Sequence, residues 1–178
     1  DQRHVFNMTG IYELPFGKGR RFLADSPLRH VLGDWSIGSI LTLQSGAPFT
    51  VTTQVNSVFS AAGALRADVA RNPNLPNGER TLGRWFDTAA FSQPAPARFG
   101  NQGVNLLRAD GLMNVDFSVL RSFSLGEQRK IQLRGESFNI ANHPNFGVPG
   151  RVFGGPGFGI VSSAGPARRI QIGLRLVY

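Results

Sequence analysis

The chain ends with RRIQIGLRLVY, residues 168–178, and this stretch decides the fold because apolar and polar side chains alternate along it. Strand side chains point to opposite faces with a period of two. One face would carry Ile170, Ile172, Leu174, Leu176 and Tyr178, and the other would carry Arg169, Gln171, Gly173, Arg175 and Val177. Such a strand, ending in an aromatic residue, is typical of a transmembrane barrel, in which aliphatic side chains face lipid and arginines face a wet lumen.

Four earlier segments carry a similar alternation, at residues 4–14, 35–45, 112–123 and 129–138. They are separated by residues that favour turns and loops. The pattern predicts an all-β fold, an antiparallel meander of about five strands that is a partial segment of a transmembrane β-barrel. The charged residues expected on its inward, lumen-facing side are Asp116, Arg134, Glu136, Arg169 and Arg175.

The third and fourth of these segments are expected to form a hairpin. Outward residues are odd-numbered on both, so paired positions must sum to an even number and the turn must contain an odd number of residues. A three-residue loop with Gly126 at or beside a left-handed position fits. One allowed register pairs Phe117 with Gly135, so that an aromatic ring covers a glycine. The same register places Asp116 diagonal to Arg134, which predicts an inward ion pair.

Two long connections join the strands, at about residues 46–111 and 139–167. A connection of this length within a compact domain indicates function or disorder. Outer-membrane barrels carry their long loops on the extracellular side. The aromatic residues of the first connection are expected to pack it on itself or on the barrel rim. Contact with a ligand is the alternative role for Trp85, Phe86, Phe91 and Phe99.

Composition narrows the class of protein. At 178 residues with 41% hydrophobic content, the chain is long enough for one ordinary domain. The absence of cysteine excludes disulfides, thiol nucleophiles and thiolate metal sites. The net charge of +8 would permit nucleic-acid binding. However, the 19 basic residues are scattered along the chain, and we expect no nucleic-acid partner.

Motifs for enzymatic chemistry are missing from the sequence. His4, His30 and His143 are isolated and lack metal-ligand spacing. The Gly-Lys pair at residues 17–18 does not fit a phosphate-binding loop, and the glycine-rich run at 154–159 lacks the strand-to-helix context of a nucleotide loop. No G-x-S-x-G nucleophile elbow occurs. We therefore expect no enzymatic activity, no catalytic residue, no metal and no cofactor.

The beginning of the chain predicts a piece of a longer protein. Asp1-Gln2-Arg3 comes first, without an initiating Met or an apolar signal segment. Residues 35–65 carry no charge, but Gly46, Pro48 and many polar residues interrupt them. We therefore expect no helical membrane span there.

Several stretches resemble the C-terminal barrel portion of TonB-dependent outer-membrane receptors of the Oar-like type. The resemblance covers nearly the whole chain, and its most specific carrier is RGESFNIANHPNFG at residues 134–147. The terminal strand alone would mark any outer-membrane barrel. The other carriers are YELPFGKG at 12–19, SGAPFT at 45–50, WFDTAAF at 85–91, FGN at 99–101 and IQIGLRLVY at 170–178.

The resemblance implies that residues 1–178 are the C-terminal part of a barrel that has 22 strands in the full-length family. The N-terminal plug domain and the TonB box would be absent from this chain. The whole protein would be a ligand-gated importer of the bacterial outer membrane, energised by the TonB complex through the missing N-terminal part. Its substrate cannot be read from the sequence.

The same resemblance implies further partners: the rest of the barrel and its plug, outer-membrane lipid, and the barrel-assembly machinery. That machinery would read the terminal strand as its signal, with Tyr178 in place of the commoner Phe. The signal residues are Ile170, Ile172, Leu174, Leu176 and Tyr178.

The lengths of the connections fit the resemblance. If Tyr178 lies at the periplasmic rim, the connections at 15–34 and 124–128 are periplasmic, and those at 46–111 and 139–167 are extracellular. The alternative is a secreted β-sandwich, a binding or adhesion module whose long loops recognise carbohydrate or protein. Such a module would be soluble without detergent.

Overall fold

The computed structural model of the chain describes residues 1–59, 63–126 and 129–178. Five long strands dominate it: β1 (Val5–Glu13), β2 (Trp35–Gln44), β8 (Leu112–Ser124), β9 (Lys130–Phe138) and β11 (Arg169–Val177). Each begins and ends within one residue of the bounds that the alternation predicts. The helical segments are short, namely α1 (Arg29–Leu32), η1 (Asn77–Glu79) and η2 (Thr88–Ala90). Among the described residues, no helix has the length and apolar character needed to cross a membrane.

The chain divides into two compact units. The sheet unit comprises Val5–Leu43, Met113–Pro144 and Pro166–Tyr178. The loop unit comprises Asp1–His4, Gln44–Leu112 and Asn145–Gly165.

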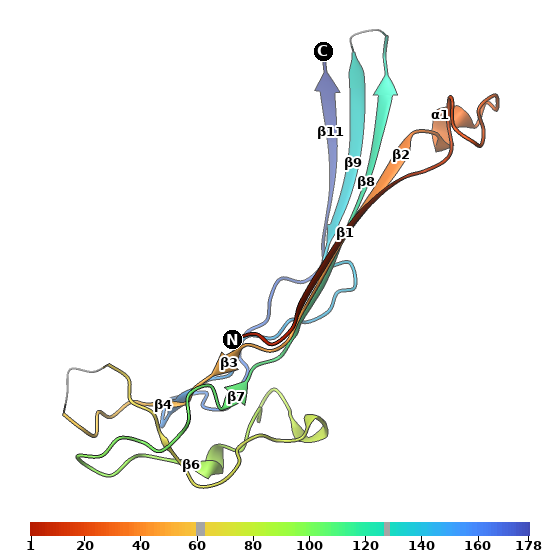
Figure 1. Ribbon diagram of the computed structural model, residues 1–178. Helices are drawn as coiled ribbons and strands as arrows, with labels where there is room; N and C mark the ends of the chain where they lie inside the picture. Colours follow the sequence, from red (N-terminus) through yellow and green to blue (C-terminus); the bar gives the residue numbers. More distant parts are fainter. Residues whose placement is uncertain (60–62, 127–128) are drawn as a thin grey trace. The chain divides into compact units, whose positions relative to one another are not determined.

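The sheet unit contains one five-stranded sheet in the order β1-β2-β8-β9-β11, which is also the order along the chain (Figure 1). β8 is antiparallel to β9, and β9 is antiparallel to β11. Within the described residues, β1 and β11 are the two edges, and each pairs with a single neighbour. The predicted all-β antiparallel meander is therefore confirmed, as an open sheet that does not close on itself.

The register of the β8–β9 hairpin differs from the one predicted. Gly135 lies opposite Val119 rather than Phe117, although paired positions still sum to an even number. The Cγ2 methyl of Val119 lies 3.1 Å from the place that a Cβ of Gly135 would occupy. A β-branched side chain, instead of an aromatic ring, therefore covers the glycine.

The turn explains the shift of register. The Leu125 amide donates a 2.8 Å hydrogen bond to the Arg129 carbonyl, so the ladder continues past β8 and the turn begins at Gly126. Gly126 has φ +122°, in the region that favours glycine. Residues 127–128, on which part of the predicted 124–128 turn falls, lie outside the described residues.

One face of the sheet is apolar, with one charged residue on it. Leu174 of β11 lies opposite Leu133 of β9, which lies opposite Arg121 of β8. The Arg121 side chain is buried, with only 5% of the residue exposed. Its guanidinium lies 5.6 Å from the Trp35 ring centre and 4.2 Å from that of Phe123. Stacking on aromatic faces is a favourable environment for a guanidinium.

The connector between β1 and β2, predicted only as a connection at residues 15–34, folds over this end of the apolar face. Its helix α1 presents the carbonyls of His30 and Val31 to Arg121, which donates a hydrogen bond to each. The indole nitrogen of Trp35 also donates to the Val31 carbonyl, at 3.1 Å. These bonds supply donors to carbonyl groups near the end of a short helix.

The loop unit has a hydrophobic core of its own, to which both long connections contribute. Three short ladders frame it: β3 (Pro48–Phe49) with β7 (Leu107–Arg108), β5 (Asp68–Val69) with β6 (Phe91–Ser92), and β4 (Thr52–Thr53) with β10 (Val152–Phe153). Phe86 is 1% exposed and lies at the centre of the core. Its ring centre is 5.3 Å from that of Phe158, which belongs to the second connection.

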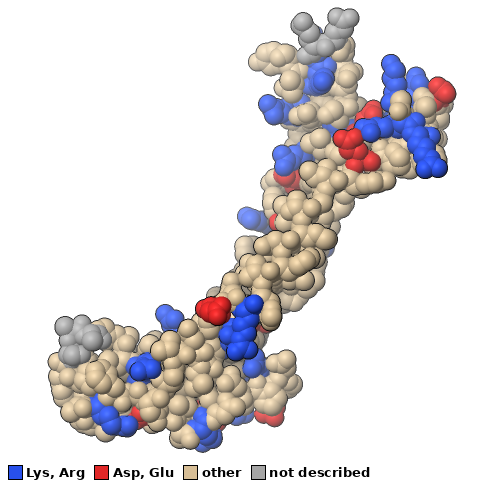
Figure 2. Space-filling model, in the orientation of Figure 1, with Lys and Arg blue, Asp and Glu red and all other residues tan. Residues whose placement is uncertain are grey.

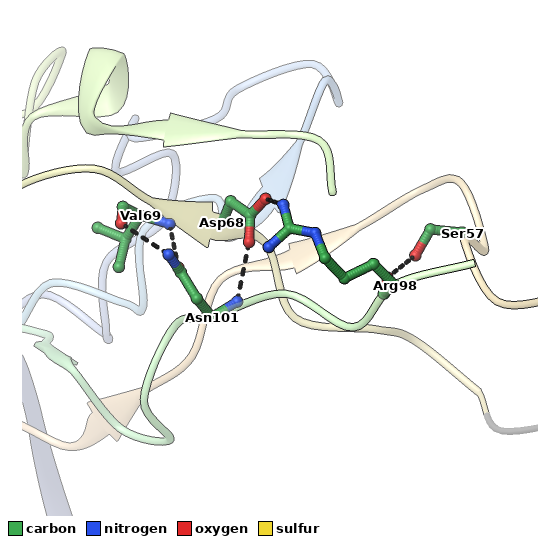
Figure 3. A network of polar contacts seen from close by, with 5 residues as sticks. All are labelled: Ser57, Asp68, Val69, Arg98 and Asn101. Carbon is green, nitrogen blue, oxygen red and sulfur yellow. Dashed lines mark hydrogen bonds and ion pairs between the residues drawn. The ribbon is translucent and has the colours of Figure 1, made fainter. Parts of the chain in front are cut away.

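A polar network joins separate parts of the first connection (Figure 3). Asp68 pairs with Arg98 and accepts a 2.9 Å hydrogen bond from the Asn101 amide. The Asn101 side chain accepts from the Val69 amide at 2.7 Å and donates to the Val69 carbonyl at 3.3 Å. Ser57 donates to the Arg98 carbonyl at 2.7 Å. Asn101 thus satisfies both backbone groups of Val69, as a neighbouring strand would.

Gly100 generates a stability prediction for the loop unit. A Cβ at this position would lie 2.1 Å from the Arg66 carbonyl oxygen and 2.5 Å from that of Ala67. Because backbone must move to relieve these contacts, Gly100→Ala should destabilise the loop unit by about 1–3 kcal/mol. Hydrogen exchange at the Val69 amide, followed by mass spectrometry, should accelerate about tenfold.

Gly103→Ala is the matched control, because no atom lies within 4 Å of the place where its Cβ would be. It should leave exchange at Val69 unchanged. Equal exchange in the two variants would show that the close approach at Gly100 does not constrain the loop unit.

Candidate functional site

The polar face of the sheet holds the charged residues that the alternation selects. Glu136 of β9 lies opposite Gln171 of β11, and Arg175 lies opposite Gln132. Arg169 lies opposite Phe138, at the other end of the same ladder. Since residues opposite one another in a ladder share a face, Arg169 and Arg175 lie on the same side as Glu136.

Arg134 and Glu136 form the charged centre of this face. Arg134 makes an ion pair with Glu136, and Glu136 also accepts a hydrogen bond from the Gln171 side chain. The side chain of Glu136 is 17% exposed and that of Arg134 is 59% exposed. A pair this open to solvent contributes about 0–1 kcal/mol, so it orders the face more than it stabilises the fold. Gln171 was predicted on the inward face but was not named among the site residues, which were all charged. The ladder places it opposite Glu136.

Asp116 does not form the predicted ion pair with Arg134. Its Oδ1 atom accepts hydrogen bonds of 2.9 Å from the Asn139 amide and from the Asn114 side chain. The shifted register is the reason, because it places Leu120 opposite Arg134. Asp116 therefore holds the end of β9 instead of neutralising an arginine.

A hollow of about 210 Å³ lies along the polar face. Its walls include Asp116, Ser118, Arg134 and Glu136, together with residues 9–11 of β1 and 38–40 of β2. It offers both donors and acceptors to water or to a polar solute. Arg169 and Arg175 do not line this hollow, and neither makes an ion pair within the described part of the chain.

Asn139 fixes the point at which the second long connection leaves the sheet. Its φ is +51°, a conformation that asparagine tolerates better than most residues. The side-chain amide donates to the carbonyls of His143 at 3.0 Å and Pro166 at 3.2 Å, and its oxygen accepts from the His143 amide at 3.0 Å. Asn142 similarly accepts a 3.1 Å bond from the Arg168 amide. The asparagines of 134–147 thus join the end of β9 to the start of β11.

The terminal strand presents its apolar residues to solvent along an open edge. Ile172 is 79% exposed and Tyr178 is 93% exposed, and Ile170, Leu174 and Leu176 are also exposed. Alternating aliphatic residues on an unpaired edge can contact lipid on one face and accept a further strand at the edge.

The four aromatic loop candidates are divided between core and surface. Phe86 and Phe91 are buried in the core of the loop unit, and Trp85 packs partly buried against it. The Trp85 indole donates a 2.9 Å hydrogen bond to the Arg108 carbonyl. Phe99, which is 63% exposed, is the member with a free ring surface. The first connection therefore packs on itself through three of these rings.

Comparison with known proteins gives the family. The family model described as outer membrane beta barrel domain matches residues 1–171. No curated protein and no solved structure matches the chain. The open sheet does not favour the alternative of a secreted β-sandwich, because a sandwich packs two sheets face to face. The chain belongs to the outer membrane beta barrel domain family and resides in the bacterial outer membrane.

Proposed function

We propose that the chain is a wall segment of a TonB-energised, ligand-gated importer of the Oar-like type. The observation that carries the proposal is the five-stranded sheet, with one exposed apolar face, one polar face and two open edges. A segment of this kind lets lipid meet the apolar side while solute and water meet the polar side. It has no catalytic role, and it uses no cofactor and binds no nucleic acid.

The number of strands supports a larger barrel. About eight strands is the smallest number that usually closes. An open sheet leaves a row of unpaired backbone groups at each edge, which hydrocarbon cannot satisfy. We therefore infer that the neighbours of β1 and β11 are further strands of the same barrel, whose lumen would hold the plug domain of the proposed receptor.

The topology supports a sidedness for this barrel. The β1–β2 connector, the β8–β9 turn and Tyr178 lie at one end of the sheet, since neighbouring strands alternate in direction. The two long connections leave from the opposite end. Long loops of outer-membrane barrels are extracellular, so the end of the sheet from which the long connections leave is the extracellular end, and Tyr178 lies at the periplasmic rim. There the terminal strand is read by the barrel-assembly machinery, and the TonB complex acts on the N-terminal part of the protein.

Substitutions on the two faces of β9 test which face meets lipid. Leu133→Arg and its neighbour across the ladder, Leu174→Arg, should each cost about 2–4 kcal/mol, because an arginine near the bilayer midplane is poorly solvated. Ile131→Arg and Ile172→Arg lie on the same face and should behave alike. The measurement is the amount of folded protein in outer-membrane fractions.

Gln132→Arg is the control for this comparison, because residue 132 precedes Leu133 on the strand and lies on the polar face. It should assemble at close to the native level. If Leu133→Arg assembled equally well, the assignment of the apolar face to lipid would be wrong.

The size of the assembled barrel is a second prediction. In a semi-native gel of the outer-membrane fraction, antiserum against residues 63–110 should detect a band several times larger than 19.3 kDa. The band should shift on boiling, because closed barrels resist detergent until heated. A band near 19.3 kDa in the soluble fraction would overturn the barrel and support a soluble binding module.

Energy coupling requires a separate measurement. Site-specific cross-linking in living cells should capture a complex between the intact protein and TonB, and its yield should change when the proton-motive force is collapsed. If the protein formed a closed barrel but gave no TonB cross-link, the assignment as a barrel wall would stand and the assignment as a TonB-energised importer would be wrong.

A further inference from the structure

We propose that the β1–β2 connector and the adjoining end of the sheet form a binding site for one glycerophospholipid. The headgroup phosphate lies in a basic hollow, and part of an acyl chain lies in an apolar hollow beside it. The site rests on the proposed function in one respect, namely that the apolar face of the sheet meets lipid.

The basic hollow has a volume of about 440 Å³. Three cationic side chains and one carboxylate line it: Lys18, Arg29, Arg121 and Asp34. Guanidinium and ammonium groups are the usual protein ligands of phosphate. The excess of cations therefore matches an anionic headgroup.

Arg121 supplies a buried donor at this hollow. Its two terminal nitrogens bond the carbonyls of His30 and Val31, but its Nε atom is buried and has no hydrogen-bond partner among the described residues. Leaving a buried charged donor unpaired costs free energy. A phosphate oxygen in the hollow would give this guanidinium an additional acceptor.

Lys18 and Arg29 keep donors available at the same place. Within the described residues, Lys18 makes no ion pair, and the one hydrogen bond of the Arg29 guanidinium goes to the Ala24 carbonyl at 2.7 Å. Figure 2 shows Lys and Arg side chains gathered over this connector, at the upper right of the view. Both side chains can therefore turn to a ligand without first breaking an ion pair.

The apolar hollow adjoins the basic one and has a volume of about 290 Å³. Trp35, Ile37 and Val119 line it from the strands, and Phe16, Leu23 and Leu32 line it from the connector. Trp35 of the apolar hollow lies next to Arg121 of the basic hollow, because its ring centre is 5.6 Å from the Arg121 guanidinium. An apolar hollow continuous with the apolar face of the sheet suits an acyl chain better than a soluble anion.

The position along the sheet agrees with the depth of a headgroup. The connector lies at the end of the sheet that carries the β8–β9 turn and the C-terminus. Tryptophan and basic residues are enriched where a bilayer meets water. Trp35 and the basic hollow therefore lie at the depth where a phosphate is available.

The test compares matched variants of the intact protein, extracted from outer membranes in mild detergent. Binding of short-chain phosphatidylglycerol is measured by native mass spectrometry and by the shift in thermal unfolding midpoint. Lys18→Gln with Arg29→Gln should weaken binding about tenfold, because two cations near the phosphate are lost. Arg121 is kept, since its hydrogen bonds also hold α1.

Arg20→Gln with Arg21→Gln is the control, because it removes the same charge from the same connector without altering the lining of the basic hollow. It should change the affinity by less than about twofold, since the one ion pair it breaks is exposed. If both double variants lost affinity for phosphatidylglycerol equally, binding would depend on the net charge of the connector and not on this site, and the proposal would be overturned.

Leu32→Trp distinguishes a lipid from a free phosphate by filling the apolar hollow. It should weaken phosphatidylglycerol binding while leaving any binding of glycerol 3-phosphate unchanged. If glycerol 3-phosphate bound as tightly as the lipid and Leu32→Trp had no effect, the site would be a phosphate site only. A bound polypeptide mass in place of lipid would likewise overturn the proposal.

Failure of the lipid site and failure of the proposed function give different results. Loss of the site alone would leave the Leu133→Arg and Gln132→Arg variants clearly different in assembly. If the sheet does not meet lipid, those two variants would assemble equally well, whatever the phospholipid measurements show.

Discussion

Backbone hydrogen bonding is the constraint on which the rest of this structure depends. In a membrane, each N–H and C=O of a lipid-facing sheet must find its partner within the protein. β2, β8 and β9 meet this requirement because each lies between two neighbours, whereas β1 and β11 have one neighbour each. In the proposed barrel, further strands would therefore pair with both open edges of the sheet unit.

The two faces of the sheet depend on that pairing, because a slip of one residue would exchange them. The ladders keep Leu174, Leu133 and Arg121 on one face and Gln171 and Glu136 on the other. The single charge on the apolar face is compensated locally. Arg121 stacks on two aromatic rings and bonds the carbonyls of α1, so the same contact that covers the charge also positions the connector.

The loop unit shows how two irregular connections can be presented as one folded body. Phe86 from the first connection and Phe158 from the second share a core, and burying a phenylalanine contributes about 1.5–3 kcal/mol. The Asn139 and Asn142 bonds fix where the second connection leaves and rejoins the sheet. An exposed ring such as Phe99 is therefore carried by a packed scaffold.

The sequence by itself determined the all-β class, the five strands and the division into an apolar and a polar face, because a period of two is a local property of the chain. The resemblance carried by residues 134–147 further predicted an outer-membrane barrel, which the family match confirms. The tertiary structure alone decided the hairpin register, the partner of Asp116, the burial of Arg121 and the common core of the two connections. These four features depend on contacts between residues distant in sequence or on the exact position of a turn. Alternation along a single strand specifies neither the contacts nor the turn position.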